Sequence, residues 1–364
     1  MSNSFFPSRT ITFYMARMFL IRSFAIVFAL VLVLQTLDLL GESGKILAVK
    51  GNTGAQVWTY LSLRLPQIVA FVLPFAMLLG TLVTLATLNQ NSEVVAMKAA
   101  GLSAHQVLAP LIVASLGVAA LSFAFNDRIV SRSNATLDLW QKAEYGPMPR
   151  ARGGQANVWV REGGNLINAK RVSGRGAAAQ LGDVTVYNRT GGMLQSILTA
   201  SSASAVGSGW RLRDAVRFDV VSGKRTKLGT IDAAEGVRPD QFTLANVDPD
   251  GLSFRRLWNA IDDMRAAGRP TGALEANLWH KLAGPLSSAL MPLLGAVAAF
   301  GIARSGRLFI RAVIGMGLGF AYFVADNFGL AMGNLGAYPP LLAAWGPFLL
   351  FLLIGEAVLV QTEE

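Results

Sequence analysis

The sequence contains no cysteine and only two histidines, His105 and His280, among its 364 residues. Without a thiol the chain cannot form a disulfide, a thiolate metal site or a cysteine nucleophile. Two histidines also exclude a metal site built from a histidine cluster. The sequence has no G-x-x-x-x-G-K-S/T phosphate loop, no Gly-rich dinucleotide loop and no G-x-S-x-G nucleophile elbow. We therefore expect no catalytic residue, no bound metal and no cofactor in this chain.

Charge is also scarce. Charged residues make up 15% of the chain and apolar residues 52%, whereas a soluble domain carries about 25% charged residues. The charges are unevenly spread: residues 127–277 hold 21 Lys/Arg and 15 Asp/Glu, and the other 213 residues hold only 11 and 7. A segment so poor in charge does not present an ordinary water-facing surface, so the composition indicates a membrane protein with one soluble insert.

Long uncharged stretches mark the membrane helices. A helix needs about 20 apolar residues to cross the hydrocarbon core, because each residue rises about 1.5 Å. No Asp, Glu, Lys or Arg occurs in 65–92, 106–126, 282–303 or 327–355. Gly and Pro residues in 333–340 divide the last apolar run into two helices. The predicted spans are 12–37, 63–89, 106–127, 279–303, 309–331 and 341–361.

The distribution of Lys and Arg predicts the orientation, because these residues concentrate in short cytoplasmic loops. One set of helix ends carries Arg9, Arg17, Lys98, Arg304, Arg307 and Arg311. The other set carries Lys45, Lys50, Arg64 and Lys281. We expect a multi-pass inner-membrane protein with both termini on the cytoplasmic side and the soluble insert outside, in a periplasm-like space.

The soluble insert has the pattern of β-strands. Apolar residues alternate with polar ones at a period of two. The alternating sets are Val158/Val160, Val184/Val186, Trp210/Leu212 and Val216/Phe218/Val220. Short antiparallel strands at this spacing favour a sandwich or jellyroll-like all-β fold. The predicted domains are 1–127 with three membrane helices, 128–277 with the β domain, and 278–364 with three more helices. Within the insert, 128–146 continue the third span and 252–267 form an amphipathic helix. The β domain is either a spacer or a domain that docks partners or conducts a ligand.

The loop between the second and third spans contains a short apolar helix, predicted at about 92–101. Ser92 is placed to cap it, Glu93 lies in its first turn, and Gly101 ends it. It would present Val94, Val95 and Met97. A solvated loop does not need an apolar helix with a single Glu. Two interpretations stand: a helix lying on the membrane surface, or a coupling helix that docks into a groove of a cytoplasmic motor through Glu93, Val94, Met97 and Gly101.

A few residues within the spans are functional candidates. Asp326 and Glu356 are ionisable residues near span ends. For Asp326 a role in gating or assembly and plain interfacial solvation are both open, and Glu356 is better explained by solvation. Gly315 and Gly319 form a small-residue face typical of a helix–helix interface, within this chain or with a partner.

Taken together, these features resemble the lipopolysaccharide export permease family LptF/LptG, and within it the LptG branch. The resemblance covers almost the whole chain in the order three spans, β domain, three spans. It also rests on four strings: NSEVVAMKAAG at 91–101, VDPDGLS at 247–253, LWHKLAGPLS at 278–287 and DNFGL at 326–330. The first string is fairly specific to the family, and the others are persuasive together.

The resemblance implies a permease subunit of an ATP-driven ABC transporter that carries lipopolysaccharide out of the inner membrane. The implied partners are an LptF-like permease subunit, an LptB-like ATPase dimer that binds ATP and Mg²⁺, and LptC-like and LptA-like proteins of a periplasmic bridge. Family members can carry lysines at the outer end of the first span that suit lipid phosphates. Here that stretch has no Lys before Lys45 and Lys50, so these two and Arg64, or the partner subunit, are the candidate contacts of the substrate.

Three other functions are weighed against this one. A membrane-anchored periplasmic docking or assembly factor would not need the apolar cytoplasmic helix. A secondary transporter favours paired charges or broken helices near the midplane of the membrane, and the sequence has few of them. A lipoprotein-release permease has four spans, against the six predicted here.

Overall fold

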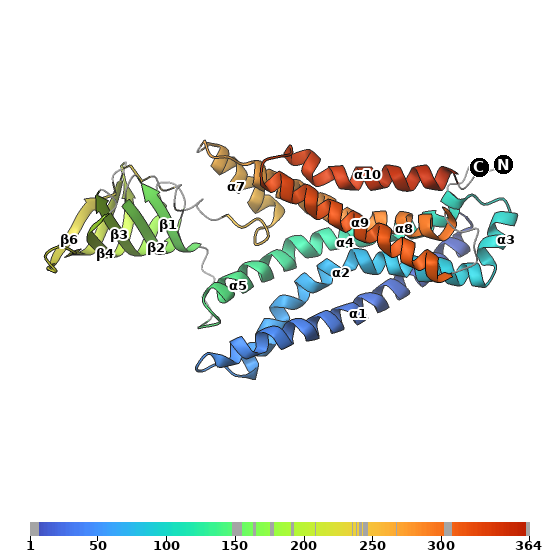
Figure 1. The fold of residues 1–364 in the computed structure, drawn as a ribbon, viewed down its shortest axis with the longest axis horizontal. Coiled ribbons are helices and arrows are strands. Elements are labelled where there is room, and N and C mark those ends of the chain that lie inside the picture. Colours follow the sequence, from blue (N-terminus) through green and yellow to red (C-terminus); the bar gives the residue numbers. More distant parts are fainter. Residues whose placement is uncertain are drawn as a thin grey trace. The chain divides into compact units, whose positions relative to one another are not determined.

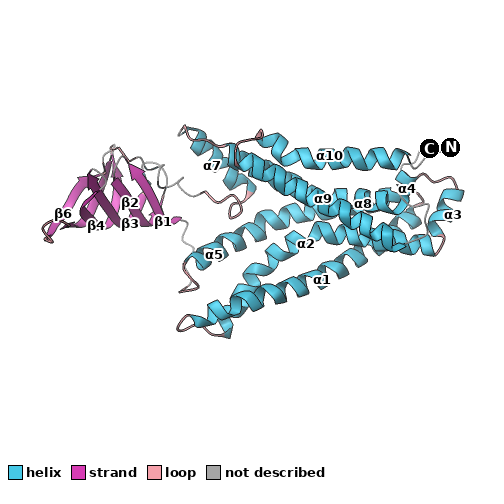
Figure 2. Ribbon diagram, in the orientation of Figure 1, coloured by secondary structure: helices cyan, strands magenta, loops and turns pink. Residues whose placement is uncertain are grey.

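The computed structural model describes residues 7–147, 155–162, 165–174, 178–190, 193–207, 209–234, 236–237, 239, 242, 247–266, 268–301 and 308–361. The chain divides into two compact units. The helical unit contains Met1–Gly146, Pro249–Ile261 and Pro270–Glu364, and the β unit contains Pro147–Asp248 and Asp262–Arg269. Figures 1 and 2 show the elements in chain order and by type. The β unit is shorter than the expected 128–277, because 128–146, 249–261 and 270–277 belong to the helical unit.

Helices build the helical unit, and one of them continues past Ile261 into residues of the β unit. They are α1 (Arg9–Ala48), α2 (Gly54–Gln90), α3 (Glu93–Ala99), α4 (Ala104–Phe125), the π-helix η1 (Asn126–Val130), α5 (Ser131–Lys142), α7 (Phe254–Ala266), α8 (Gly272–Ala296), the π-helix η3 (Val297–Gly301), α9 (Leu308–Asn334) and α10 (Pro340–Gln361). In the described part of the chain, six helices are long and apolar enough to cross a membrane. The six predicted spans are thereby confirmed.

The observed helices extend beyond the predicted spans. The helix α1 continues for three turns past residue 37, and α4, η1 and α5 form one run from Ala104 to Lys142. The prediction followed the apolar run alone, whereas a helix does not stop where its side chains become polar. The helical continuation expected at 128–146 is confirmed to Lys142, and α7 confirms the helix expected at 252–267, with Leu257 and Ile261 buried.

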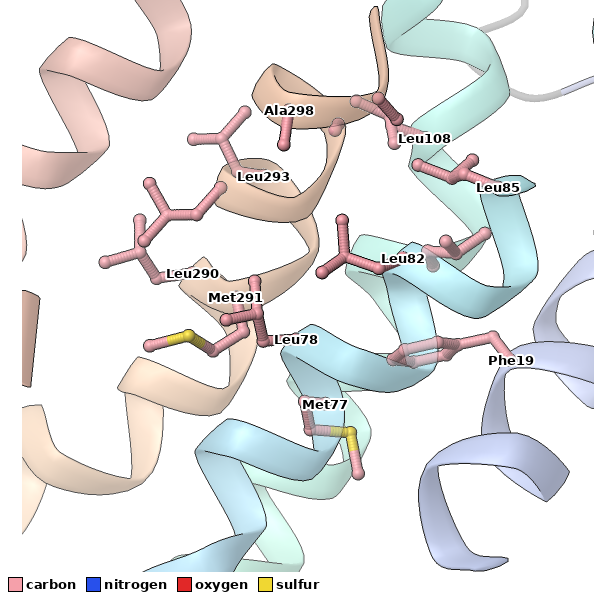
Figure 3. Packing of buried hydrophobic residues seen from close by; sticks show 14 of the residues in the cluster. Phe19, Met77, Leu78, Leu82, Leu85, Leu108, Leu290, Met291, Leu293 and Ala298 are labelled. Atoms are coloured by element: carbon pink, nitrogen blue, oxygen red, sulfur yellow. The ribbon is translucent and has the colours of Figure 1, made fainter. Parts of the chain in front are cut away.

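The core of the helical unit lies between α2 and α8. Figure 3 shows Leu78 and Leu82 of α2 beside Met291 of α8 and Ala298 of η3, with Phe19 of α1 on the other side of α2. In their most apolar windows α8 is 78% buried and α2 61%, whereas α1 and α9 are each 22% buried. The helices α1 and α9 therefore offer most of their apolar surface to lipid or to another chain.

The β unit confirms the predicted all-β insert. Its described strands are β1 (Gln155–Glu162), β2 (Asn165–Ser173), β3 (Gln180–Thr190), β4 (Met193–Val206), β5 (Gly209–Asp219) and β6 (Arg225–Ala233). They form one antiparallel sheet in the order of the sequence. One face is buried, and it includes Val158, Val184 and Trp210. The described residues between Ala233 and α7 contain no strand.

The row Val216, Phe218 and Val220 alternates with polar residues as Trp210 and Leu212 do, but it does not continue the buried face of those two residues. The β4–β5 and β5–β6 pairings skip residues between Leu212 and Ala215, where Asp214 has φ +55°. A bulge adds a residue and moves the following side chains to the opposite face. Ala215 is consequently buried, and Phe218 and Val220 are exposed.

Candidate functional site

The predicted coupling segment forms α3, which joins α2 to α4. It lies at the end of the helical unit where α1 begins and α10 ends (Figure 1). Ser92 precedes it in a left-handed conformation, φ 59°, and its side chain makes no capping hydrogen bond. The expected Ser92 cap is therefore wrong. The expected stop at Gly101 has a clear geometry: Gly101 has φ +86°, its N–H donates to Lys98 O at 2.9 Å, and Leu102 N–H donates to Met97 O at 3.1 Å. This is a Schellman motif.

The helix α3 has an inner and an outer face. Val94 is 3% exposed, and Met97 and Leu102 pack against the same core. The expectation that Val94 faces outward is wrong. Residues three apart share one helix face, and Val94 and Met97 both lie on the inner face of α3. The outer face carries the exposed residues Val95, Ala96, Lys98 and Ala99, with Val95 64% exposed. Three of these four side chains are small or medium-sized apolar groups, and the fourth is a cation.

Glu93 begins α3 and is held from two sides. Tyr14 of α1 donates its hydroxyl hydrogen to Glu93 Oε1 at 3.4 Å. Asn91 Nδ2 donates to the same oxygen at 3.2 Å. A carboxylate in the first turn of a helix also interacts favourably with the helix dipole. The geometry therefore keeps a negative charge beside the exposed face of α3 and connects it to α1.

A second polar cluster lies where α1, α2 and the end of α5 meet, at the opposite end of the helical unit. Asp38 accepts hydrogen bonds from Tyr60 at 2.7 Å and from Arg64 Nε at 3.1 Å. Arg64 Nη2 lies 3.0 Å from the same oxygen, Asp38 Oδ1, so two guanidinium nitrogens contact one carboxylate oxygen. Such pairs hold the guanidinium in one orientation.

Glu42 is the second carboxylate of this cluster. It pairs with Lys45 at 2.8 Å and accepts a hydrogen bond from Tyr145 at 2.7 Å. The Tyr145 ring packs edge-to-face on Trp140 and Tyr60. Burial, together with the Glu42 carboxylate, raises the pKa of Tyr145 to about 12. The phenol therefore stays protonated and ties the end of the third span to α1.

Two of the three predicted substrate contacts are already in ion pairs within this chain. Lys45 and Arg64 are already paired with Glu42 and Asp38. Lys50 is exposed and has no carboxylate partner in the described part of the chain. The four charges of these two ion pairs cancel, so among the three predicted contacts Lys50 has the most accessible positive charge for an anionic headgroup.

The intramembrane carboxylates each face a histidine. Asp326 Oδ2 of α9 lies 3.0 Å from His280 Nε2 of α8, and only 13% of the Asp326 side chain is exposed. Glu356 Oε2 of α10 lies 3.2 Å from His105 Nε2 of α4, and its side chain is 44% exposed. Asp326 is therefore an interior residue that links two spans, and Glu356 is the more solvated of the two.

The glycines of α9 lie against neighbouring spans of this chain. A Cβ atom added at Gly319 would come within 2.3 Å of Leu78 Cδ2, and one at Gly315 within 2.8 Å of Leu82 Cδ2. A Cβ atom at Gly317 would meet nothing within 4 Å. Two of the three glycines therefore permit close contact between α9 and α2, and Gly317 faces away.

The family described as lipopolysaccharide export system permease LptF/LptG matches residues 13–361. The chain belongs to the LptF/LptG family. It is 29% identical to the LptG permease protein of Escherichia coli (strain K12) over 320 residues, which is 85% of this chain and 86% of that protein. It is 23% identical to LptG of Haemophilus influenzae over 314 residues, which is 82% of this chain and 84% of that protein.

Membership of the LptF/LptG family covers the spans, the β insert and α3 alike, and it agrees with the resemblance seen in the sequence. It favours a permease over a docking or assembly factor. The polar partners Tyr14, Tyr145 and His280 were missed from the sequence, because each contacts a residue that is far away along the chain. Only the rarity of ionisable residues in the spans signals that Asp326 needs a partner.

Proposed function

We propose that this chain is the permease subunit of an ATP-driven transporter that extracts lipopolysaccharide from the inner membrane and passes it to a periplasmic bridge. Family membership and the lipopolysaccharide export permeases among its relatives support the substrate class. The part of the proposal that concerns ATP rests on the structure of α3. It combines an exposed apolar face with a fixed carboxylate, on a chain whose sequence has no phosphate-binding loop.

The motor is a separate chain in this proposal. An LptB-like ATPase dimer binds ATP and Mg²⁺, and this subunit binds no cofactor itself. The outer face of α3, with Val95 and Ala99, packs into a groove of the ATPase. Glu93 pairs with an Arg or Lys at the rim of that groove, and Gly101 fixes the angle at which α3 joins α4. Closure of the ATPase dimer moves α3 as a rigid lever.

The remaining partners belong to the same proposal, and the exposed spans support a contact with a second permease subunit. The helices α1 and α9 are the least buried spans, and they face an LptF-like permease subunit across the substrate cavity. An LptC-like protein and an LptA-like bridge receive the lipid from the β unit. Both termini then lie in the cytoplasm and the β unit in the periplasm. Lys50, and after rearrangement Lys45 and Arg64, attract the anionic headgroup.

Substitution of the exposed face of α3 tests the proposal. Val95→Arg places a long cation where the groove of the ATPase would close on α3, but it disturbs no buried residue, because Val95 is 64% exposed. The matched control is Val221→Arg, the same change at an 81% exposed valine of the β unit. Both variants and the parent chain are purified in detergent together with the other chains of the operating complex.

We expect the parent chain and Val221→Arg to retain a P-loop ATPase with ATP-hydrolysis activity, and Val95→Arg to lose it. Equal retention by both variants would show that α3 is not the docking element. If no ATPase accompanies the parent chain, the motor-coupled permease is contradicted.

A further inference from the structure

A cavity of about 330 Å³ lies inside the helical unit. Its walls come from α2, from the run α4–η1–α5, from α8 and from α9. The His280–Asp326 pair lies in its wall, together with Ser288 of α8 and Asn134 of α5. The volume is at the lower end of the range for small-molecule sites, so it suits a group of only a few heavy atoms.

Four buried polar atoms of the residues that line the cavity have no partner in the described part of the chain, and two of them can only accept hydrogen bonds. In the described part of the chain, no donor reaches Asp326 Oδ1 or Asn134 Oδ1, although both atoms are buried. The hydroxyls of Ser288 and Tyr322, on residues that are 1% and 3% exposed, also lack a partner there, and each can both donate and accept. Buried polar atoms are almost always hydrogen-bonded, and an amide or carboxylate oxygen only accepts. The complement to this cavity is therefore a group that donates hydrogen bonds.

The charges of the wall favour a cationic donor. Asp127, Asp250 and Asp326 line the cavity against one lysine, Lys281, and the imidazole of His280. The rings of Phe71, Phe75 and Phe323 contribute to the wall, and Phe323 packs on the other two with centroid distances of 5.7 and 5.3 Å. Aromatic faces and carboxylates both attract a compact cation.

A multivalent metal ion fits less well. Such ions need several clustered carboxylates or carbonyls at short distance, and the described residues contain no group of three or more His, Asp or Glu side chains that would hold one. An organic ammonium group needs only a few acceptors at hydrogen-bond distance and tolerates the apolar part of the wall.

The backbone beside the cavity is also unusual. The π-helix η1 interrupts the third span, and Asn126 and Asp127 of this segment line the cavity. Short π-helical segments occur frequently at functional sites, because the extra residue in the turn redirects side chains. Here the segment brings polar side chains of a membrane span towards His280 and Asp326.

We propose that this cavity binds a primary ammonium group on a short carrier, such as the aminoethyl group of ethanolamine, free in solution or as a lipid headgroup. Asp326 Oδ1 accepts the charge-assisted hydrogen bond, and His280 fixes the Asp326 carboxylate. Asn134 Oδ1 and Ser288 Oγ are further unpartnered acceptors in the wall of the cavity. This site does not depend on the proposed transport function, because binding is measured without ATP or lipopolysaccharide.

The test is the melting temperature of the full complex in nanodiscs of phosphatidylcholine. Ethanolamine hydrochloride is titrated at constant ionic strength, with ethanol and NaCl as matched additives. We expect ethanolamine to raise the melting temperature with a saturable dependence, and ethanol and NaCl to leave it unchanged. Asp326→Asn should weaken the apparent affinity about tenfold or more. The matched control Glu356→Gln, which alters the other His–carboxylate pair, should bind like the parent.

Two further measurements complete the test. Ser288→Ala should weaken ethanolamine binding less than Asp326→Asn does. If Asp326→Asn does not fold, weaker binding by Ser288→Ala than by the parent is the result that supports the site. Nanodiscs with and without phosphatidylethanolamine separate the two sources of the ammonium group. If the site binds a lipid headgroup, phosphatidylethanolamine raises the melting temperature of the parent and of Glu356→Gln but not of Asp326→Asn. If the site binds only the free amine, phosphatidylethanolamine leaves the melting temperature of the parent unchanged. Equal shifts with ethanol, equal affinities in the parent and the tested cavity variant, or no shift in the parent would overturn the proposal.

Discussion

Tyr14 of α1 and Glu93 of α3 are joined by a hydrogen bond of 3.4 Å, although 79 residues separate them. The contact connects one of the two least buried spans to the helix proposed to receive the motor's movement. It gives α3 a direct mechanical connection to α1, in addition to its covalent connections to α2 and α4.

Removal of that hydrogen bond tests the connection. Tyr14→Phe keeps the ring and loses the hydroxyl, so the cost is about 1 kcal/mol or less at this exposed position. We expect the ATPase to remain bound and lipid-stimulated ATP hydrolysis to fall by up to about fivefold. Loss of the ATPase from the purified complex would mean that Tyr14 supports α3 itself and does not transmit its movement.

Gly101 controls how α3 ends. Its φ of +86° suits glycine, and a Cβ atom there meets nothing within 4 Å, so Gly101→Ala changes only the conformational energy. We expect a destabilisation of about 1 kcal/mol, seen as faster hydrogen exchange in α3. Gly117→Ala is the control, because Gly117 lies within α4, has no positive φ and is also open. Equal exchange in the two variants would contradict the Schellman stop as the support of α3.

Close packing of α9 predicts that alanine substitutions at two neighbouring glycines differ sharply in their effect on stability. Gly319→Ala places a Cβ atom 2.3 Å from the Leu78 side chain, whereas Gly317→Ala meets nothing within 4 Å. Leu78 is 1% exposed and has little room to move. We expect Gly319→Ala to cost about 1–3 kcal/mol and to lower the melting temperature, and Gly317→Ala to be neutral or slightly stabilising. A neutral Gly319→Ala would indicate that α9 moves freely against α2.

The phenol of Tyr145 predicts a pH dependence at alkaline pH. Its pKa is raised to about 12 by burial and by Glu42, above the value of about 10 in an unfolded chain. Its stabilising contribution is therefore fully present below pH 10 and lost as the pH rises towards 12. Tyr145→Phe should melt at a lower temperature at neutral pH, and its melting temperature should fall less between pH 10 and 12. An unchanged slope over that interval would exclude Tyr145 as its cause.

Much of the architecture was predictable from the sequence. Absence of charge over 65–92 or 282–303 leaves little alternative to a membrane helix, and period-two alternation at Val158/Val160 requires a half-buried strand. The resemblance to the LptF/LptG family added function, which composition alone does not supply. Helix ends were predicted poorly, because helices such as α1 continue beyond the apolar run.

The remaining features depend on long-range contacts. The bulge at Asp214 reverses the face of the following residues without a turn signal in the sequence. The inward direction of Val94 depends on where α3 meets the core. The ion pair between Lys45 and Glu42 could have been predicted from the sequence, because the two residues are three positions apart on one helix. The ion pair between Arg64 and Asp38 could not, because the two residues lie on different helices.

Transfer of lipopolysaccharide by the reconstituted complex tests the central claim most directly. The parent chain, Val95→Arg and Val221→Arg are each assembled with their partner chains in proteoliposomes that contain lipopolysaccharide, and a soluble acceptor protein of the bridge type is added outside. We predict that lipopolysaccharide reaches the acceptor only when ATP is hydrolysed, with the parent and Val221→Arg active and Val95→Arg inactive. ATP-independent transfer, or none from a parent complex that hydrolyses ATP, would contradict the account.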